Sequence, residues 1–390
     1  MEKITITKKG FILFIMIFFS LKIGAISYLS NYLNILWHVG AIIMIIYGIG
    51  ILSKDKKMQP FDLIVIIFYI VLTLSTIINK GSLSECIKEL IAFYALYITM
   101  SLGINKDAKK YIKIMNNFLI VYTIINTLSA IIFYPNSMFR DNNNPIFFLG
   151  GDNTSIRLYI ASILFYFLNN YIKTNKINIP IFPLLNLFIF SMLRDIGGGK
   201  VCFIILFIGF IYLNFVKEPP KKVIRKIMIF NIILFLMLVI LNKMSIFSFF
   251  IVNLLHRDLT LTDRTVIWEV TIDKIINKPI LGYGIIDGLK FQAMLPFITG
   301  INAHNTYLMI LFNGGVILFI LFIYLFVLTL KKFDSFKHSK WLYAIPIALL
   351  SLSVRAQIEG WDVVWIILFL KMAYSYDRIQ NIIENKEQGE

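Results

Sequence analysis

Long apolar runs recur along the whole chain, and they limit its possible folds more than any other feature. A helix needs about 20 apolar residues to cross the hydrocarbon core of a bilayer. Twelve runs near this length are present, close to residues 10–30, 34–52, 61–79, 86–104, 113–133, 156–172, 178–193, 198–216, 226–243, 303–329, 341–356 and 361–377. The sequence therefore predicts an all-α polytopic membrane protein with about 12 transmembrane helices.

The composition agrees with this class of protein. Of the 390 residues, 58% are hydrophobic and only 15% are charged, whereas a soluble domain carries about 25% charged residues. So small a polar fraction excludes a disordered chain and argues strongly against a soluble enzyme, whose surface it could not cover. The two cysteines, Cys86 and Cys202, lie far apart without metal-ligand spacing. We interpret both as small apolar residues, and a disulfide between them stays open.

The formal net charge of +16 comes largely from short clusters of basic residues between the apolar runs. Every second loop is Lys-rich, which is typical of cytoplasmic loops. These segments lie near residues 3–9, 54–57, 106–110, 173–176, 217–226 and 331–340, and after residue 377. With the N-terminus inside, both termini are predicted to be cytoplasmic. The basic charge thus indicates topology and gives no reason to expect a nucleic-acid partner.

Four parts follow from this topology. Residues 1–243 contain helices 1–9, residues 244–302 form a large extracytoplasmic loop with interfacial helices, residues 303–377 contain helices 10–12, and residues 378–390 are a cytoplasmic tail. The close pairs 178–193/198–216 and 341–356/361–377 could each be re-entrant instead, which would leave the loop sides unchanged. The first apolar run lacks a small-residue cleavage site, so we expect a span there and no cleaved signal peptide.

Arginine, unlike lysine, gathers in the loops that are predicted to face outward. A guanidinium is a planar fork that binds phosphate oxygens in a bidentate way. The set therefore predicts a phosphate-bearing ligand on the outer face, although any one arginine could simply pair with a nearby carboxylate. Its members are Arg140, Arg157, Arg194, Arg257, Arg264 and Arg355.

The large loop contains one clear helical pattern. Apolar residues at helical spacing follow Arg264, and either Thr262 or Asp263 could cap the helix. Asn277-Lys-Pro279 is expected to end it, and Leu281-Gly-Tyr-Gly284 reads as a turn. Arg264 and Trp268 are four residues apart and so share a face. We expect this helix at the membrane interface, where a tryptophan fits.

His304 is a candidate general base. It lies where the tenth apolar run meets water, so it can stay neutral near pH 7 and accept a proton. The alternative is a helix-end histidine that is bonded to a carbonyl. No zinc spacing or Asp-x-Asp pair occurs, and Gly197-Gly-Gly-Lys200 is not a P-loop because Val201 replaces the Ser or Thr. We therefore expect no metal and no cofactor.

These motifs together resemble the O-antigen ligase/polymerase family, which includes Wzy-type polysaccharide polymerases. The resemblance rests on Asp263-Arg264-Thr-Val-Ile-Trp268, Pro279-Ile-Leu-Gly282-Tyr-Gly284 and His304-Asn305-Thr-Tyr-Leu308, in this order and on one side of the membrane. Asp263 stands where a glycine is common in the family. An earlier cationic element of the family corresponds to the stretch 191–200, where either Arg194 or Lys200 could fill the role.

The resemblance implies a metal-independent, inverting glycosyl transfer at the outer face of the bacterial cytoplasmic membrane. The donor would be an undecaprenyl-diphosphate-linked oligosaccharide repeat unit, and a second glycan would be the acceptor. His304 and Arg264 would be the catalytic residues, and membrane lipid, a flippase and a chain-length regulator would be candidate partners. The residues expected to bind substrate are Arg194, Lys200, Arg157, Asn305, Arg257 and Trp268.

Two alternatives stay open. A ligase that moves a finished glycan to another acceptor would use the same chemistry. A flippase or transporter of lipid-linked sugars would also have about twelve spans, but it should place its charges in a central cavity. The one-sided arginines favour an enzyme, and a capsule, O-antigen or exopolysaccharide polymerase is the primary prediction.

Overall fold

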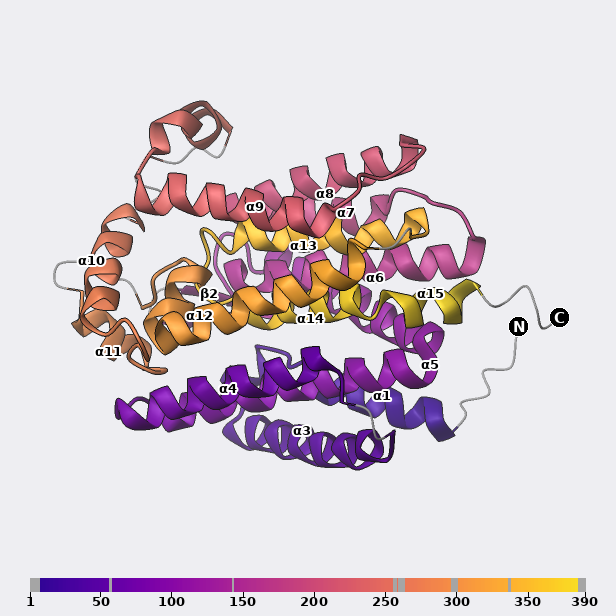
Figure 1. Ribbon diagram of the computed structural model, residues 1–390, viewed down its shortest axis with the longest axis horizontal. Helices are drawn as coiled ribbons and strands as arrows, with labels where there is room; N and C mark the ends of the chain where they lie inside the picture. Colours follow the sequence, from indigo (N-terminus) through magenta and orange to yellow (C-terminus); the bar gives the residue numbers. More distant parts are fainter. Residues whose placement is uncertain are drawn as a thin grey trace.

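The computed structural model describes residues 8–55, 58–141, 144–254, 258, 264–295, 301–335 and 338–384. Helices dominate it, and most of them lie roughly along one direction (Figure 1). The first nine are α1 (Lys8–Ser20), α2 (Ile26–Leu29), α3 (Asn31–Leu52), α4 (Pro60–Ile78), α5 (Leu83–Ile132), α6 (Asp152–Thr174), α7 (Ile181–Leu193), α8 (Gly197–Phe215) and α9 (Val223–Phe235). The others are α10 (Arg264–Asn277), α11 (Gly288–Ala293), α12 (Thr306–Phe333), α13 (Ala344–Arg355), α14 (Val363–Tyr374) and α15 (Tyr376–Glu384).

The helices fall on the predicted apolar runs and fit a polytopic membrane protein. Within the described residues, six helices are long and apolar enough to cross a membrane, and three shorter ones are apolar. The six are α3, α4, α5, α8, α9 with its continuation to Ile240, and α12. The number of twelve spans and the sidedness of the loops stay predictions.

Two helices are interrupted where the sequence changes character. α5 contains both the fourth and the fifth apolar run, and its backbone leaves helical geometry at Asp107, inside the Lys-rich segment between them. α12 is interrupted at Gly315, which has φ +62°. The first run is also not one helix, because α1 ends at Ser20 and only the short α2 follows.

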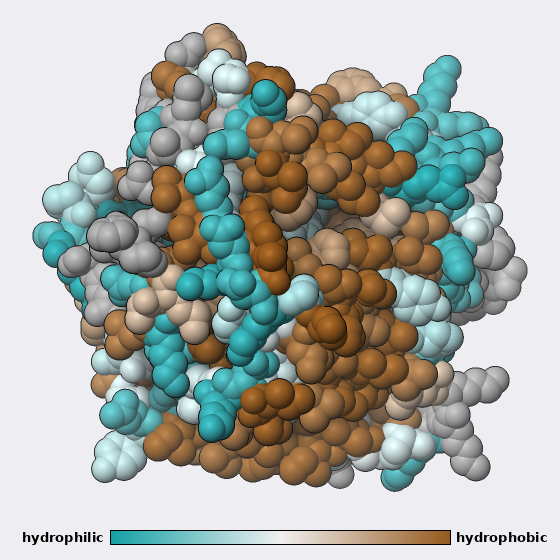
Figure 2. Space-filling model, turned by 60° about the vertical axis from the view of Figure 1, so that its left-hand side comes forward, coloured by the Kyte–Doolittle hydropathy of each residue, from teal (hydrophilic) through white to brown (hydrophobic). Residues whose placement is uncertain are grey.

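The outer surface of the bundle is strongly apolar. Figure 2 shows a broad band of hydrophobic side chains, with hydrophilic ones gathered toward its edges. On α3, Ile35, Leu36 and Ile46 are each about 60% exposed or more. Such a surface is costly in water and suits the hydrocarbon of a bilayer. Cys86 and Cys202 are buried and not bonded to one another, which closes the disulfide alternative.

A small sheet, absent from the all-α prediction, precedes α6. Strands β1 (Phe139–Asp141), β2 (Asn144–Phe147) and β3 (Gly150–Gly151) pair antiparallel in the order β1-β2-β3. Phe139 pairs with Ile146, and Phe147 pairs with Gly150. The strands are too short to show a period-two pattern in the sequence, and they bring the chain to the start of α6.

The chain turns at residues 279–281, slightly before the predicted turn at Leu281–Gly284, and the glycine-containing segment that follows bonds the interrupted part of α12. The break at Gly315 leaves carbonyls of α12 without helical partners, and an unpaired buried carbonyl is expensive. The N–H groups of Tyr283 and Gly284 donate to the carbonyls of Phe312 and Asn313 at 2.7 and 2.9 Å. Gly282 has φ +64°, and a Cβ there would lie 2.3 Å from the carbonyl oxygen of Phe312. A glycine is therefore required at this contact.

Candidate active site

The site is built where two loops meet at the end of the bundle near α10 and α11 (Figure 1). One loop, residues 301–305, leads into α12, and the other, residues 356–362, joins α13 to α14. Thr306 connects them, because its N–H donates to the carbonyl of Ala356 at 2.8 Å and its hydroxyl donates to the carbonyl of Glu359 at 2.8 Å. The same hydroxyl accepts the N–H of Asp362 at 3.1 Å. Thr306, which belongs to the His304–Leu308 motif, thus holds the loop between α13 and α14 in place.

Asn305 completes this connection. Its side-chain oxygen caps α12 by accepting the N–H of Leu308 at 3.0 Å, and its amide nitrogen donates to the carbonyl of Gln357 at 2.8 Å. The residue is fully buried. Its predicted substrate contact stays untested, but these bonds indicate that Asn305 holds the backbone beside His304.

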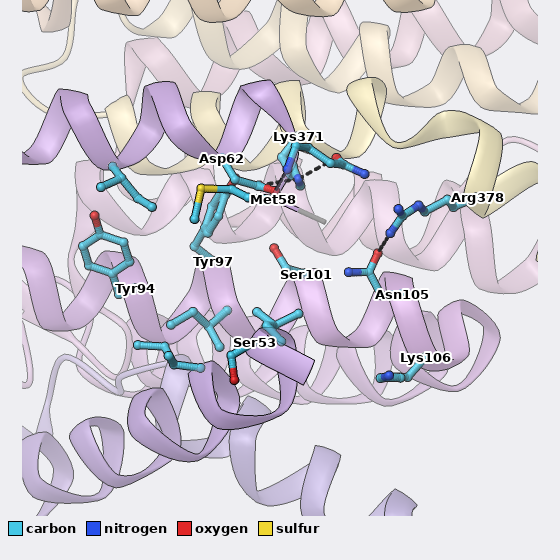
Figure 3. Close-up of a pocket in the computed structure, with 15 residues that line it drawn as sticks. Ser53, Met58, Asp62, Tyr94, Tyr97, Ser101, Asn105, Lys106, Lys371 and Arg378 are labelled. Atoms are coloured by element: carbon cyan, nitrogen blue, oxygen red, sulfur yellow. Dashed lines mark hydrogen bonds and ion pairs between the residues drawn. The ribbon is translucent and has the colours of Figure 1, made fainter. Parts of the chain in front are cut away.

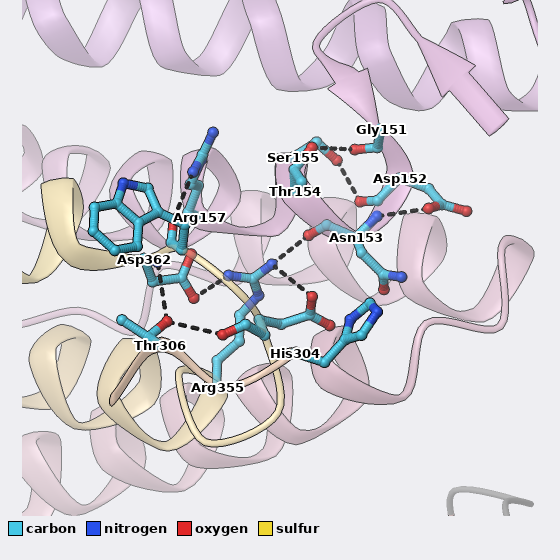
Figure 4. Close-up of polar contacts among 12 residues, drawn as sticks. Gly151, Asp152, Asn153, Thr154, Ser155, Arg157, His304, Thr306, Arg355 and Asp362 are labelled. Atoms are coloured by element: carbon cyan, nitrogen blue, oxygen red, sulfur yellow. Dashed lines mark hydrogen bonds and ion pairs between the residues drawn. The ribbon is translucent and has the colours of Figure 1, made fainter. Parts of the chain in front are cut away.

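Arg355 lies at the centre of the charged cluster. Its guanidinium donates to the Asp362 carboxylate and to the carbonyl of Asn153 at 2.5 Å, and it lies 3.9 Å from the Glu359 carboxylate. The side chain is only 2% exposed, so these partners are needed to balance its charge. Figure 4 shows this network bringing the start of α6 to the end of α13.

Arg264 reaches the same cluster from α10. Its Nη2 lies 3.7 Å from Oε1 of Glu359, and its side chain is 18% exposed. Arg264 is thus more accessible than Arg355, although both lie beside Glu359. A guanidinium that keeps some exposure can donate hydrogen bonds to phosphate oxygens, whereas one enclosed by carboxylates cannot.

Trp268 lies one turn along the same face of α10, as its spacing predicted. Its indole N–H donates to the carbonyl of Ala303 at 2.9 Å, directly before His304. The side chain is 1% exposed, so it packs inside the protein and does not face the membrane interface as we expected, whereas the position of α10 relative to the membrane stays a prediction. Arg264 on the same helix lies 3.7 Å from Glu359. α10 therefore positions both the Arg264 guanidinium and the loop that carries His304.

His304 has a positive φ angle and a lowered pKa. Its φ is +45°, and its N–H donates to the side-chain oxygen of Asn302 at 2.8 Å. Burial, and to a lesser degree the charge of Arg264, lower the pKa of His304 to about 4. The imidazole is therefore neutral at pH 7 and can accept a proton. Figure 4 shows its ring between Arg355 and the residues Asp152 and Asn153 at the start of α6.

Arg157 belongs to the cluster, one turn after the start of α6. Its Nη1 donates to the carbonyl of Trp361 at 3.1 Å. The indole N–H of Trp361 in turn donates to Glu89 of α5 at 2.6 Å. Arg157 thus supports the loop between α13 and α14 from the side of α6.

Arg194 and Lys200 lie at the junction of α7 and α8 and have different partners. The Arg194 guanidinium donates to the carbonyls of Pro135 and Asn136 at 3.3 and 3.4 Å and lies over the ring of Phe147. Lys200 pairs with Asp195 at 2.5 Å. Burial raises the pKa of Asp152, whereas the charge of Arg194 lowers it and that of Glu359 raises it. Arg194 and Glu359 thus both influence Asp152 at the start of α6, and the choice between Arg194 and Lys200 as the second cation stays open.

Other predicted residues fall outside the described part of the chain. Arg257, and the capping candidates Thr262 and Asp263, are among them. The predicted helix that follows is confirmed, since α10 begins at Arg264 and ends at Asn277. Among the described residues, no three His, Cys, Asp or Glu side chains are grouped so as to hold a metal ion.

Arg355, Glu359 and Asp362 form the centre of the cluster, and of these only Arg355 was predicted, as one of the outward arginines. A signal was available in the sequence. Three charged residues within eight positions between two apolar helices are costly near a membrane and need a reason.

The fold and this cluster define a polytopic membrane protein with a cationic site at one end of its helices. Residues 185–323 match the family model described as O-Antigen ligase. This part of the chain is therefore similar to the O-antigen ligase/polymerase family, as the three motifs within it predicted. The match contains Arg194, Lys200, Arg264 and His304, and it ends before Arg355. No protein in the curated comparison set matches the chain.

Proposed function

We propose that the protein is a Wzy-type glycosyltransferase that joins polyprenyl-diphosphate-linked oligosaccharide repeat units at the outer face of the bacterial cytoplasmic membrane. One observation carries this proposal. A neutral imidazole, His304, lies beside a partly exposed guanidinium, Arg264, in a cluster of buried charges. A proton acceptor next to a phosphate-binding cation is the pair that transfer from a lipid diphosphate requires.

Arg264 would bind the diphosphate. A diphosphate is a good leaving group when nearby cations balance its negative charge, so a strong general acid is not needed. A guanidinium can meet two phosphate oxygens at once and stabilise the charge that develops as the bond breaks. Arg194, at the junction of α7 and α8, would help Arg264 to bind the diphosphate.

His304 would activate the acceptor hydroxyl. A pKa of about 4 makes it a weak base in the empty site. A bound diphosphate changes this, because a nearby negative charge favours the imidazolium and offsets the effect of Arg264. Donor binding would thus raise the basicity of His304 when it is needed.

The reaction would be a single displacement. The acceptor oxygen bonds to the anomeric carbon of the donor while its proton passes to His304. The bond between the anomeric carbon and the diphosphate oxygen breaks, and the electron pair leaves with the lipid diphosphate. Attack opposite the leaving group inverts the anomeric centre. No step requires a metal, so a chelator should leave the rate unchanged.

An apolar cavity near His304 suits the lipid part of the donor. It has a volume of about 320 Å³, lies between α9 and α12, and is lined by Tyr307, Phe235 and Phe322 among others. Tyr307 follows His304 by three residues, and its hydroxyl donates to the carbonyl of Ser353 at 3.0 Å. A prenyl chain held here would carry its diphosphate toward Arg264.

A ligase is the second candidate, and the description of the matching family is equally consistent with it. The deciding experiment reconstitutes the purified protein with a lipid-linked repeat unit, with and without a different glycan acceptor. A ladder of glycans without the added acceptor supports a polymerase. A single transfer that depends on the added acceptor supports a ligase, and movement of labelled lipid across the bilayer without new glycosidic bonds would replace both with a flippase.

A further inference from the structure

A second cavity lies far from His304, at the end of the bundle that holds the Lys-rich break in α5. Its volume is about 730 Å³, within the range of roughly 300–1000 Å³ that ligand pockets occupy. α14 connects the two places, because it begins next to Asp362 in the cluster and carries Lys371 into this cavity. Figure 3 shows its lining residues, which come from α3, α4, α5, α14 and α15 and from the residues that precede α4.

One side of this cavity is polar and carries positive charge. Lys371 is 5% exposed, forms an ion pair with Asp62 and donates to the side chain of Gln59 at 3.0 Å. Arg378 bonds the side-chain oxygen of Asn105, and Lys106 lies beside them in the wall (Figure 3). A basic cluster at the end of helices that span a membrane is a typical site for anionic lipid headgroups.

Basic residues outnumber acidic ones in the described lining of this cavity. Lys106, Lys371 and Arg378 line it, together with one carboxylate, that of Asp62. The lining thus offers several cationic groups near one another.

The other side of the cavity is apolar. Ile49 and Leu52 of α3, Ile66 of α4 and Ile98 of α5 line it together with Tyr94. Ile49 is 53% exposed on the outer surface of the bundle. An occupant could therefore extend an alkyl chain from the polar side toward the hydrocarbon of the bilayer.

We propose that this cavity binds an anionic phospholipid, with its phosphate between Lys106 and Arg378 and an acyl chain along Ile49, Leu52 and Ile98. The chemistry that it recognises is a phosphate group joined to an apolar chain. Because the lipid would contact five helices, its binding should hold this end of the bundle together and stabilise the folded protein. The proposal does not depend on the reaction at His304.

The test compares lipids by native mass spectrometry and thermal unfolding of the full-length protein in detergent. The probes are phosphatidylglycerol, phosphatidylcholine with the same chains, and inorganic phosphate. Phosphatidylglycerol is expected to stay bound and to raise the Tm, whereas the other two have little effect. Equal retention of phosphatidylcholine would overturn the charge recognition, and the same rise with inorganic phosphate would replace the lipid with a free anion.

Two double variants with the same loss of charge locate the site. Lys106→Gln/Arg378→Gln changes the cavity wall and should weaken retention of phosphatidylglycerol at least tenfold. Lys109→Gln/Lys113→Gln removes two charges from the same part of α5, outside the cavity lining, and should leave retention unchanged. Equal losses in both would overturn the proposal. If the first double variant does not fold, the single changes Lys106→Gln and Lys113→Gln give the same comparison.

Discussion

The Arg264 guanidinium lies 3.7 Å from the Glu359 carboxylate, and this pair joins α10 to the loop between α13 and α14. Glu359 also lies 3.9 Å from Arg355, so one carboxylate holds two arginines with different exposures. Arg355 is enclosed and Arg264 is not. The Glu359 carboxylate therefore orients the Arg264 guanidinium. A phosphate that binds Arg264 would have to share this guanidinium with Glu359.

Glu359→Gln tests this positioning. The amide keeps the shape but loses the charge, so Arg264 should bind the donor no less well while its orientation is relaxed. We expect kcat to fall by about 10²-fold and the KM for the donor to stay the same or decrease. Steady-state kinetics of the reconstituted enzyme measure both. Glu269→Gln, an exposed carboxylate on α10, is the control, and an increase in KM without a change in kcat would contradict the positioning role.

His304→Ala should abolish glycan transfer while the protein remains in the membrane. The loss of a general base lowers a rate by about 10²–10⁴-fold. Gel analysis of the glycan products measures the loss. His38→Ala is the control, since this histidine lies on α3 and bonds the carbonyl of Asn34. Full activity of His304→Ala would remove the base assignment.

The pH profile should reveal the lowered pKa of His304. An imidazole with a pKa of about 4 is neutral in the free enzyme at any pH well above that value. The acidic limb of kcat/KM, which reports the free enzyme, should therefore lie near pH 4. The limb of kcat should lie at higher pH, because the bound diphosphate favours the imidazolium. Coincident limbs near the ordinary histidine value would disprove the effect of burial.

Arg264→Lys should lose most of the activity. A lysine keeps the charge but replaces the planar fork with a point charge. Loss of one such stabilising group lowers kcat by roughly 10²–10³-fold. The initial rate of glycan transfer measures the effect, and Arg140→Lys, at an exposed arginine of β1, should be close to wild type. A similarly mild effect of both changes would make Arg264 merely structural.

Arg355→Met should destabilise the fold. It leaves the Asp362 and Glu359 carboxylates buried without their shared cation, and removing one partner of a buried pair costs about 3–5 kcal/mol. Chemical unfolding in detergent gives the change in the free energy of unfolding. The double variant Arg355→Met/Asp362→Leu should recover part of the loss. A change below about 1 kcal/mol for the single variant would show that Arg355 is not needed for stability.

Local sequence information predicted the helices well. The apolar runs became helices, and α10 has the start and end that its spacing and its Asn277-Lys-Pro279 stop signal indicated. A turn was also predicted at Leu281–Gly284, and the structure has it slightly earlier, at residues 279–281. The short sheet before α6 and the break after α1 were missed, since strands of two to four residues and a helix that ends inside an apolar run leave little local pattern.

The site was only partly predictable. Arg264 and His304 were candidates because they belong to motifs in the linear sequence, and the structure joins those motifs through Trp268 and the carbonyl of Ala303. The Trp268 side chain was expected to face the membrane interface, and it is buried in the protein. Its surroundings come from elements far away in the chain, so its own neighbours in sequence could not reveal them.

What the sequence by itself determined is the class of protein and the chemistry available to it: apolar helices for a membrane, and arginines with a histidine at their ends. Hydrophobicity and helical spacing are local properties, so they can be read along the chain. Only the tertiary structure decided that Arg355 is enclosed and Arg264 more accessible, because their side chains are 2% and 18% exposed although both lie beside Glu359. Burial by distant helices sets the cost of each charge, and it therefore separates the supporting arginine from the one that can meet a phosphate.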